Sequence, residues 1–278
     1  MRSMHRSART RTRGASAGLT GRTAGAGAPL TDVTYPPLDV PKPVARDLWI
    51  VDSGPLRAAG VMPLPVRMSV VRLAGGGLWL HSPTRYDPDL HRALAEIGPI
   101  RHLVAPNIAH WTLLRDWQIH CPEALTWAAP NLRRRGQVRA RMRAGLRLDR
   151  DLGDAAPPDW ARDLRQVVVP GALGFREVAF FHEASRSLIL TDLVLNLEPG
   201  RLPAWMRPLA RLVGITAPDG RAPAYLRGAV RLGGAEARRA AAALVALAPE
   251  RVLFAHGAWF ARDGTAALRR SLRWLLKT

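Results

Sequence analysis

The stretch IRHLVAPNIAHW (residues 100–111) begins as an apolar run typical of a buried strand and ends in polar side chains, with Asn107 and His110 just after the run. The same arrangement occurs twice more, in SLILTDLVLN (187–196) with Asp192 and in VLFAHGAWF (252–260) with His256. Side chains at strand ends of α/β folds converge on shared ligands. We therefore expect these polar groups to meet at one site.

Strand and helix patterns alternate on both sides of this stretch. Strands are expected at 47–53, 67–73, 78–82, 125–130, 165–171, 176–182 and 186–192. Helices are expected at 88–97, 111–120, 235–248 and 264–276, with Asp87 and Asp263 as caps of the first and last. The first two strands should be joined by a loop containing Pro55, Gly60, Pro63 and Pro65. This order predicts an α/β fold with helices on both faces of mixed sheet.

The beginning of the chain differs in composition from the rest. Residues 1–31 contain six arginines and no acid, and they show no apolar periodicity. We expect residues 1–40 to be a disordered Arg-rich tail and residues 41–278 to form one domain. Three interpretations of the tail stay open: a disordered extension, an upstream start codon, and a transit peptide.

The net charge of +19 is unevenly distributed. Residues 131–150 hold eight arginines and one acid, Asp149, so we expect 133–147 to form an exposed basic face. Such a face binds polyanions weakly and without specificity through counterion release. No stretch reaches the ~18 uncharged apolar residues of a transmembrane helix, and we expect a cytoplasmic protein. Cys121 is the single cysteine, which excludes an intramolecular disulfide.

Residues 202–213 predict an amphipathic helix. Its apolar side would hold Leu202, Trp205, Met206, Leu209 and Leu212, with Arg207 and Arg211 on the other side and Pro208 kinking or shortening it. Two interpretations follow: a lid over the core, which the pattern favours, or a helix lying on a membrane surface.

The three polar strand ends also resemble a known family. VAPNIAHW with the downstream WQIHCPEA, then FFHEASRSLILTDLVLN, then FAHG are similar to the metallo-β-lactamase superfamily, and more closely to its branch described as domain of unknown function 4336. The resemblance covers roughly residues 44–276. It implies an αββα sandwich with the site at one edge of the paired sheets.

The resemblance also implies a reduced metal site. The superfamily's HxHxDH motif falls on residues 105–110, where Ala105, Asn107 and Ala109 replace two histidines and the aspartate, and only the last histidine, His110, remains. Asp192 matches the bridging aspartate and His256 the closing histidine. One metal site has therefore lost its ligands, while His110, Asp192 and His256 remain to hold one zinc or another divalent transition metal.

Two functions are compatible with this pattern. Three protein ligands and an open position suit a catalytic zinc, which would make the chain a metal-dependent hydrolase. However, Ala109 replaces the aspartate that orients the attacking water in this superfamily, so usual two-metal hydrolysis is not expected. The alternative is a non-catalytic descendant that binds a ligand or an anion. We expect His81, His102 and His182 to be structural, and the three metal-ligand candidates to lie within about 5 Å of one another.

Overall fold

The computed structural model describes residues 33–58 and 62–276, which belong to one compact unit. Residues 1–32 of the expected tail lie outside the described residues. A seven-stranded sheet runs in chain order: β1 (Lys42–Ala45), β2 (Leu48–Ala58), β3 (Met62–Arg72), β4 (Leu78–His81), β5 (Ile100–Ala105), β6 (Leu125–Ala128) and β7 (Arg150–Asp151). Strands β1 to β4 pair antiparallel and β4 to β7 pair parallel.

A second sheet faces the first. It has the order β12-β10-β9-β8, formed by β8 (Leu164–Pro170), β9 (Arg176–His182), β10 (Ser187–Ile189) and β12 (Arg251–Leu253). Strands β8, β9 and β10 pair antiparallel, whereas β10 pairs parallel with β12. The strands β11 (Leu195–Asn196) and β13 (His256–Gly257) form a separate, short parallel sheet.

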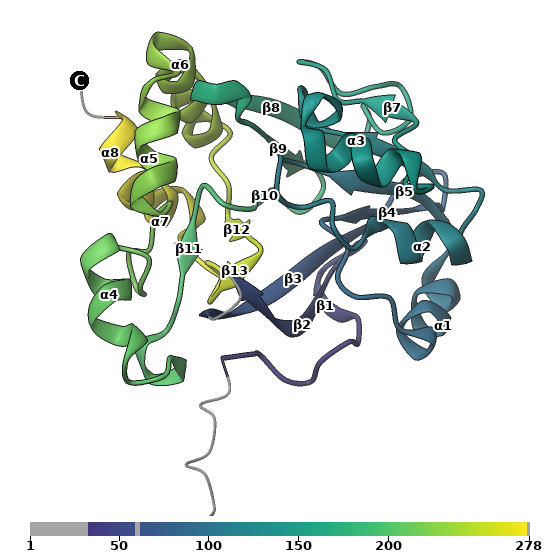
Figure 1. The fold of residues 1–278 in the computed structure, drawn as a ribbon, viewed down its shortest axis with the longest axis horizontal. Helices are drawn as coiled ribbons and strands as arrows, with labels where there is room; N and C mark the ends of the chain where they lie inside the picture. Colours follow the sequence, from purple (N-terminus) through teal and green to yellow (C-terminus); the bar gives the residue numbers. More distant parts are fainter. Residues whose placement is uncertain (1–32, 59–61, 277–278) are drawn as a thin grey trace, which may run out of the picture. The chain divides into compact units, whose positions relative to one another are not determined.

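Helices cover the outer face of each sheet (Figure 1). On the first sheet these are α1 (Pro88–Ile97), α2 (Leu114–His120) and α3 (Gly136–Arg143). On the second they are α5 (Ala224–Arg231), α6 (Gly234–Ala246), α7 (Gly264–Ser271) and α8 (Arg273–Leu276). The remaining elements are α4 (Met206–Val213) and the single turns η1 (Leu132–Arg134), η2 (Ala172–Gly174) and η3 (Pro199–Arg201).

Three apolar clusters hold these layers together. The cluster between the sheets joins Trp79 of β4 and Trp127 of β6 to Phe180 of β9. A second cluster fills the space between the first sheet and α1 to α3, and a third fills the space between the second sheet and α5 to α8. Four layers, helices, sheet, sheet and helices, with apolar side chains buried in the three spaces between them, form an αββα sandwich. The predicted fold class is confirmed.

The β2–β3 hairpin corrects the expected proline-rich loop. Pro55, Pro63 and Pro65 lie inside β2 and β3, not in a connection between shorter strands. Proline is tolerated there because β1 pairs only with residues 48–50 of β2 and β4 only with residues 69–72 of β3, so the outer edges of the hairpin need no N–H donor. The register shift between Ser53 and Leu56 accommodates Pro55.

The predicted helix ends were partly wrong. Asp87 caps α1 as expected, accepting from the N–H groups of Asp89 and Leu90, but Asp263 makes no capping bond to α7. The helix expected at 111–120 begins only at Leu114, because a turn that positions His110 precedes it. Among the described residues no helix is both long and apolar enough to cross a bilayer.

Residues 33–35 of the expected tail pack on the fold. Val33 is buried with Leu195 and Leu202, and the carbonyl of Thr34 accepts a hydrogen bond from Arg201. The Tyr35 ring lies 5.4 Å from the guanidinium of Arg67 and 4.8 Å from that of Arg201. We therefore expect the edge of the folded part to lie closer to residue 32 than to residue 40.

Two truncations test this boundary. A chain beginning at residue 31 should melt within about 2–4 °C of the full chain, whereas one beginning at residue 41 should lose roughly 2–3 kcal/mol, a fall of about 4–12 °C. The loss comes from exposing Val33 and removing the aromatic partner of two arginines. Thermal unfolding followed by circular dichroism measures both. Equal melting temperatures for the two truncations would contradict the expectation.

Candidate metal site

Three polar side chains from distant segments meet at one edge of the sandwich. His110 lies in the turn between β5 and α2, Asp192 follows β10, and His256 begins β13. One ligand atom from each lies within 4.8 Å of the others. The Asp192 Oδ1 atom is 3.3 Å from His110 Nε2 and 3.4 Å from His256 Nε2. The expected convergence within about 5 Å is confirmed.

Both histidines are held through their other ring nitrogen. His110 Nδ1 lies 2.6 Å from the hydroxyl of Ser82, and His256 Nδ1 lies 2.7 Å from the carbonyl oxygen of Pro65. A carbonyl only accepts, so His256 carries a proton on Nδ1, and Nε2 is the nitrogen left to face Asp192 and to bind a metal. Such outer partners fix the tautomer of metal-binding histidines and orient their rings.

Asn107 orients Asp192 and is not itself among the converging ligand atoms. Its side-chain amide donates to Asp192 Oδ2 at 2.7 Å and to the Thr191 hydroxyl at 3.0 Å. Its carbonyl oxygen accepts from the backbone N–H groups of Ala109 and His110. This single side chain ties the His110 turn to the Asp192 loop and leaves Asp192 Oδ1 directed at the two histidines.

A buried carboxylate also holds the loop that carries Asp192, through hydrogen bonds to its backbone. Glu177 of β9 accepts the backbone N–H groups of Thr191 and Asp192 at 2.8 and 2.9 Å, and that of Leu193 at 3.4 Å. Burial, and then the charge of Asp192, raise the pKa of Glu177, while the backbone donors lower it less. Sequence reasoning missed Glu177. The available signal was an acidic residue inside the apolar strand REVAFFH.

The charges at the site favour an ionised Asp192. Burial alone would raise the pKa of Asp192, but the adjacent His110 and His256 hold it well below its usual value. Burial lowers the pKa of His110, and the larger combined effect of Asp192 and Glu177 raises it overall. Without a cation, the site therefore stabilises Asp192 by hydrogen bonds and positive charge from the histidines.

A buried arginine holds the strand that carries His256. Arg67 of β3 donates to the carbonyls of Phe254 and Gly257 at 3.0 and 2.7 Å, and it pairs with Asp52 at 2.6 Å. Gly257 has φ +96°, and a Cβ there would lie 2.3 Å from the carbonyl oxygen of Asn196. Only glycine therefore allows β13 to approach β11 this closely.

The three side chains open into a cavity of about 260 Å³. Its walls are formed by Leu56, Arg57, Leu64, Val66, Ser82, Pro83, Thr84, Ala109, Thr112, Leu113 and Tyr225. Ala109, at the position of the superfamily's aspartate, contributes only a methyl group. Tyr225 lies at the mouth of this cavity, where it is 79% exposed, and its phenol is a hydrogen-bond donor.

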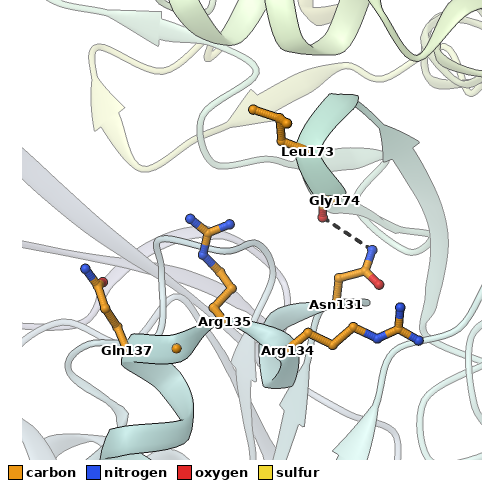
Figure 2. A pocket seen from close by; sticks show the side chains of 7 residues that line it. Asn131, Arg134, Arg135, Gln137, Leu173 and Gly174 are labelled. Atoms are coloured by element: carbon orange, nitrogen blue, oxygen red, sulfur yellow. Dashed lines mark hydrogen bonds between the residues drawn. The ribbon is translucent and has the colours of Figure 1, made fainter.

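Larger hollows elsewhere lack such a set of ligands. Figure 2 shows one of about 620 Å³ between α3 and η2, with Arg135 and Gln137 on one side and Leu173 on the other. It contains no histidine, cysteine or carboxylate among its lining residues. It belongs to the basic face, where seven of the eight arginines in residues 131–150 are exposed and Arg133 is half-buried, as expected.

The other histidines singled out from the sequence serve packing. Burial, then the charge of His110, lower the pKa of His81 to about 3, and its ring stacks on Trp79. His102 accepts a hydrogen bond from Trp127, and His182 pairs with the hydroxyl of Ser185. Their structural roles are confirmed.

Comparison with known proteins decides the family. The pattern described as "Domain of unknown function (DUF4336)" matches residues 48–213, more than half of the chain. The chain belongs to this family. No curated protein matches this member of domain of unknown function 4336 in a sequence search.

Solved structures show how the fold of this family relates to others. A metallo-β-lactamase from Pontibacter korlensis is 13% identical, with 86% of this chain and 99% of that chain covered and a TM-score of 0.52. One from Erythrobacter litoralis with β-mercaptoethanol in the active site is 16% identical, with 86% and 96% covered and a TM-score of 0.57. The FIM-1 enzyme from Pseudomonas aeruginosa in its mono-zinc form is 13% identical, with 89% and 97% covered and a TM-score of 0.56. This chain thus has the metallo-β-lactamase fold.

Proposed function

We propose that this chain is a metal-dependent hydrolase with a single metal site held by His110, Asp192 and His256. The observation that carries the proposal is the convergence of three ligand atoms within 4.8 Å at the wall of a cavity. The FIM-1 enzyme, which has a similar fold, has been solved in a mono-zinc form, and this supports a site that holds one metal ion.

The donor set fits zinc or another divalent transition metal. Two imidazole nitrogens and one carboxylate oxygen are ligands that these ions prefer, and three protein ligands leave a position open towards the cavity. Each ligand also has an outer partner: Ser82 for His110, Asn107 for Asp192, and the Pro65 carbonyl for His256. A metal in this site supplies a Lewis acid that polarises a carbonyl or phosphoryl oxygen.

The remaining residues of the cavity bind and orient the substrate. Arg57 at the rim offers a cation to an anionic group, and Tyr225 offers a phenol donor. Leu56, Leu64 and Val66 line the hairpin side and accept an apolar portion. Because Ala109 supplies no base and Asp192 is committed as a ligand with a lowered pKa, proton transfer falls to a group of the substrate or to solvent. These features fit a small substrate with one anionic and one apolar part.

Elemental analysis tests the proposal most directly. The purified chain should contain about one equivalent of zinc or another divalent transition metal, which a chelator removes. Ester, thioester and phosphodiester substrates should be hydrolysed only by the metal-loaded protein. Metal binding without turnover of any of them would favour the alternative, a non-catalytic descendant that binds a ligand in the same cavity. Absence of metal under all loading conditions would refute the site.

Replacing Ser82 by alanine should weaken the metal site without unfolding the chain. The substitution removes the 2.6 Å partner of His110 Nδ1, so the ring loses its fixed orientation. Outer partners of this kind contribute about 10–100-fold to metal affinity. Competition with a chromogenic chelator measures the change. The matched control is Ser185→Ala, which removes the hydroxyl that contacts His182. His182 is not one of the three proposed ligands. An equal effect of both substitutions would contradict the assigned role.

A further inference from the structure

Helix α4 carries an apolar stripe that the described residues, 33–58 and 62–276, leave exposed. Trp205, Leu209 and Leu212 are 61%, 53% and 80% exposed. Their spacing of four and three residues places them on one side of the helix. The sequence pattern had joined them with Leu202 and Met206 on a single core-facing side. The structure divides that side, since only Leu202, Met206 and Ala210 are buried in the fold.

The buried side of α4 already has its partners. Met206 and Ala210 pack against Val33, Leu195, Leu197 and Ile215, so the helix is docked firmly. Figure 1 shows α4 at the outer edge of the second half of the fold, beside β11. The expected packing of this helix over the core is found for Leu202 and Met206, whereas the exposed stripe needs another explanation.

The charges around the stripe identify what it can contact. Residues 198–232 contain six arginines and two acids, Glu198 and Asp219, which pair with Arg201 and Arg270. Arg211, expected on the polar side of the helix, is exposed and lies about 100° round the helix from Leu212, so it borders the stripe. Arg227 donates to the carbonyl of Val213, so α5 brings its guanidinium to the end of the stripe. An apolar stripe bordered by arginines complements a surface that is apolar inside and anionic at its rim.

We propose that the α4 stripe binds the surface of an anionic phospholipid bilayer. Trp205 would lie at the level of the head groups, where tryptophan is enriched, with Leu209 and Leu212 inserted among the first acyl carbons. The arginines beside the stripe contact lipid phosphates. The three side chains expose roughly 400 Å², about half of the ~800 Å² per partner of a stable protein interface, which favours a lipid surface over a second copy of the chain.

Vesicle sedimentation with the full chain tests the proposal. The chain should bind vesicles of phosphatidylcholine mixed with phosphatidylglycerol, and bind pure phosphatidylcholine more weakly. The double variant L209S/L212S should lower the partition coefficient about tenfold or more, because both removed side chains are the ones inserted. R211Q should lower it about fivefold on the anionic vesicles only.

A matched double variant distinguishes vesicle binding through the stripe from non-specific binding by any exposed apolar side chain. Ile119 and Leu173 are 61% and 95% exposed and lie on α2 and η2, so I119S/L173S removes as much exposed apolar surface elsewhere. It should bind within about twofold of the unmodified chain. Both double variants keep the arginines of residues 1–31, so any contribution from those arginines cancels.

Three results would overturn the proposal. The first is no binding to anionic vesicles, and the second is equal binding by L209S/L212S and I119S/L173S. The third is a dimer in sedimentation equilibrium that L209S/L212S converts to a monomer, because the stripe would then be covered by a second copy. Circular dichroism should show that both double variants remain folded, since all four side chains are exposed.

Discussion

A His256→Ala chain is expected to purify folded and without bound metal. The substitution removes one of three converging ligand atoms, and the two that remain, on His110 and Asp192, do not enclose an ion. Removing even an outer partner costs about 10–100-fold in affinity, so losing a ligand should cost more than ~100-fold. Elemental analysis after loading with zinc measures the loss.

The fold should survive because the imidazole makes two polar contacts, with the Pro65 carbonyl at 2.7 Å and with Asp192 at 3.4 Å. Losing each costs about 1 kcal/mol, so we expect a fall in melting temperature of roughly 4–8 °C. His120→Ala is the matched control, since it removes an exposed imidazole on α2. It should keep its metal. Metal retained by His256→Ala at the level of this control would show that the ligand set is wrong.

The largest loss of stability is expected for Glu177→Ala. The buried carboxylate accepts three backbone N–H groups, from residues 191–193, and alanine leaves all three without an acceptor. Each unsatisfied buried donor costs about 1–3 kcal/mol, while relief of the repulsion with Asp192 returns part of this. We expect a net loss of about 3–5 kcal/mol, measured by urea denaturation.

Two further variants show whether the hydrogen bonds are the cause. Glu177→Gln keeps one acceptor oxygen at the same place and should lose roughly half as much stability. Glu183→Ala removes a carboxylate whose contact, with Arg165, lies at the surface, and it should stay within about 0.5 kcal/mol of the original. If Glu177→Ala were no worse than Glu183→Ala, the carboxylate would not support the Asp192 loop as inferred.

Metal affinity should also depend on how the loop that carries Asp192 is held. Glu177 and Asn107 hold Asp192 from two directions, so their loss would let its carboxylate turn away from the histidines. The matched pair Glu177→Ala and Glu183→Ala can therefore also be compared for zinc affinity. This links the support beneath the site to its proposed function with one set of proteins.

The ligand set was predictable because its signal is local. Short apolar runs, LVAP, LIL and VLFA, mark three strand ends, and His110, Asp192 and His256 each lie within four residues of one of them. Their outer partners gave no such signal. Ser82 follows a strand like many serines, and Pro65 contributes a backbone oxygen, which no side-chain pattern reveals.

Helix α4 shows the limit of periodicity in another way. A helical pattern reports that apolar side chains share a side, but it does not report how wide a surface the neighbouring elements cover. Here β11 and residues 33–35 cover only the part that holds Met206 and Ala210. Trp205, Leu209 and Leu212 remain exposed although the sequence pattern grouped them with buried residues.

The sequence by itself determined the layered α/β class, the family resemblance, the basic face and the three ligand candidates. The fold class and the basic face follow from composition and local spacing, because strand and helix periods are properties of the local chain. The ligand candidates follow from short motifs that resemble those of the family. Only the tertiary structure decided what the three candidates could do. Their distances, the outer partner of His256, the buried acceptor Glu177 and the uncovered side of α4 depend on contacts between separate elements, up to 191 residues apart in the chain. Such contacts depend on how the sheets pack, and no local pattern records them.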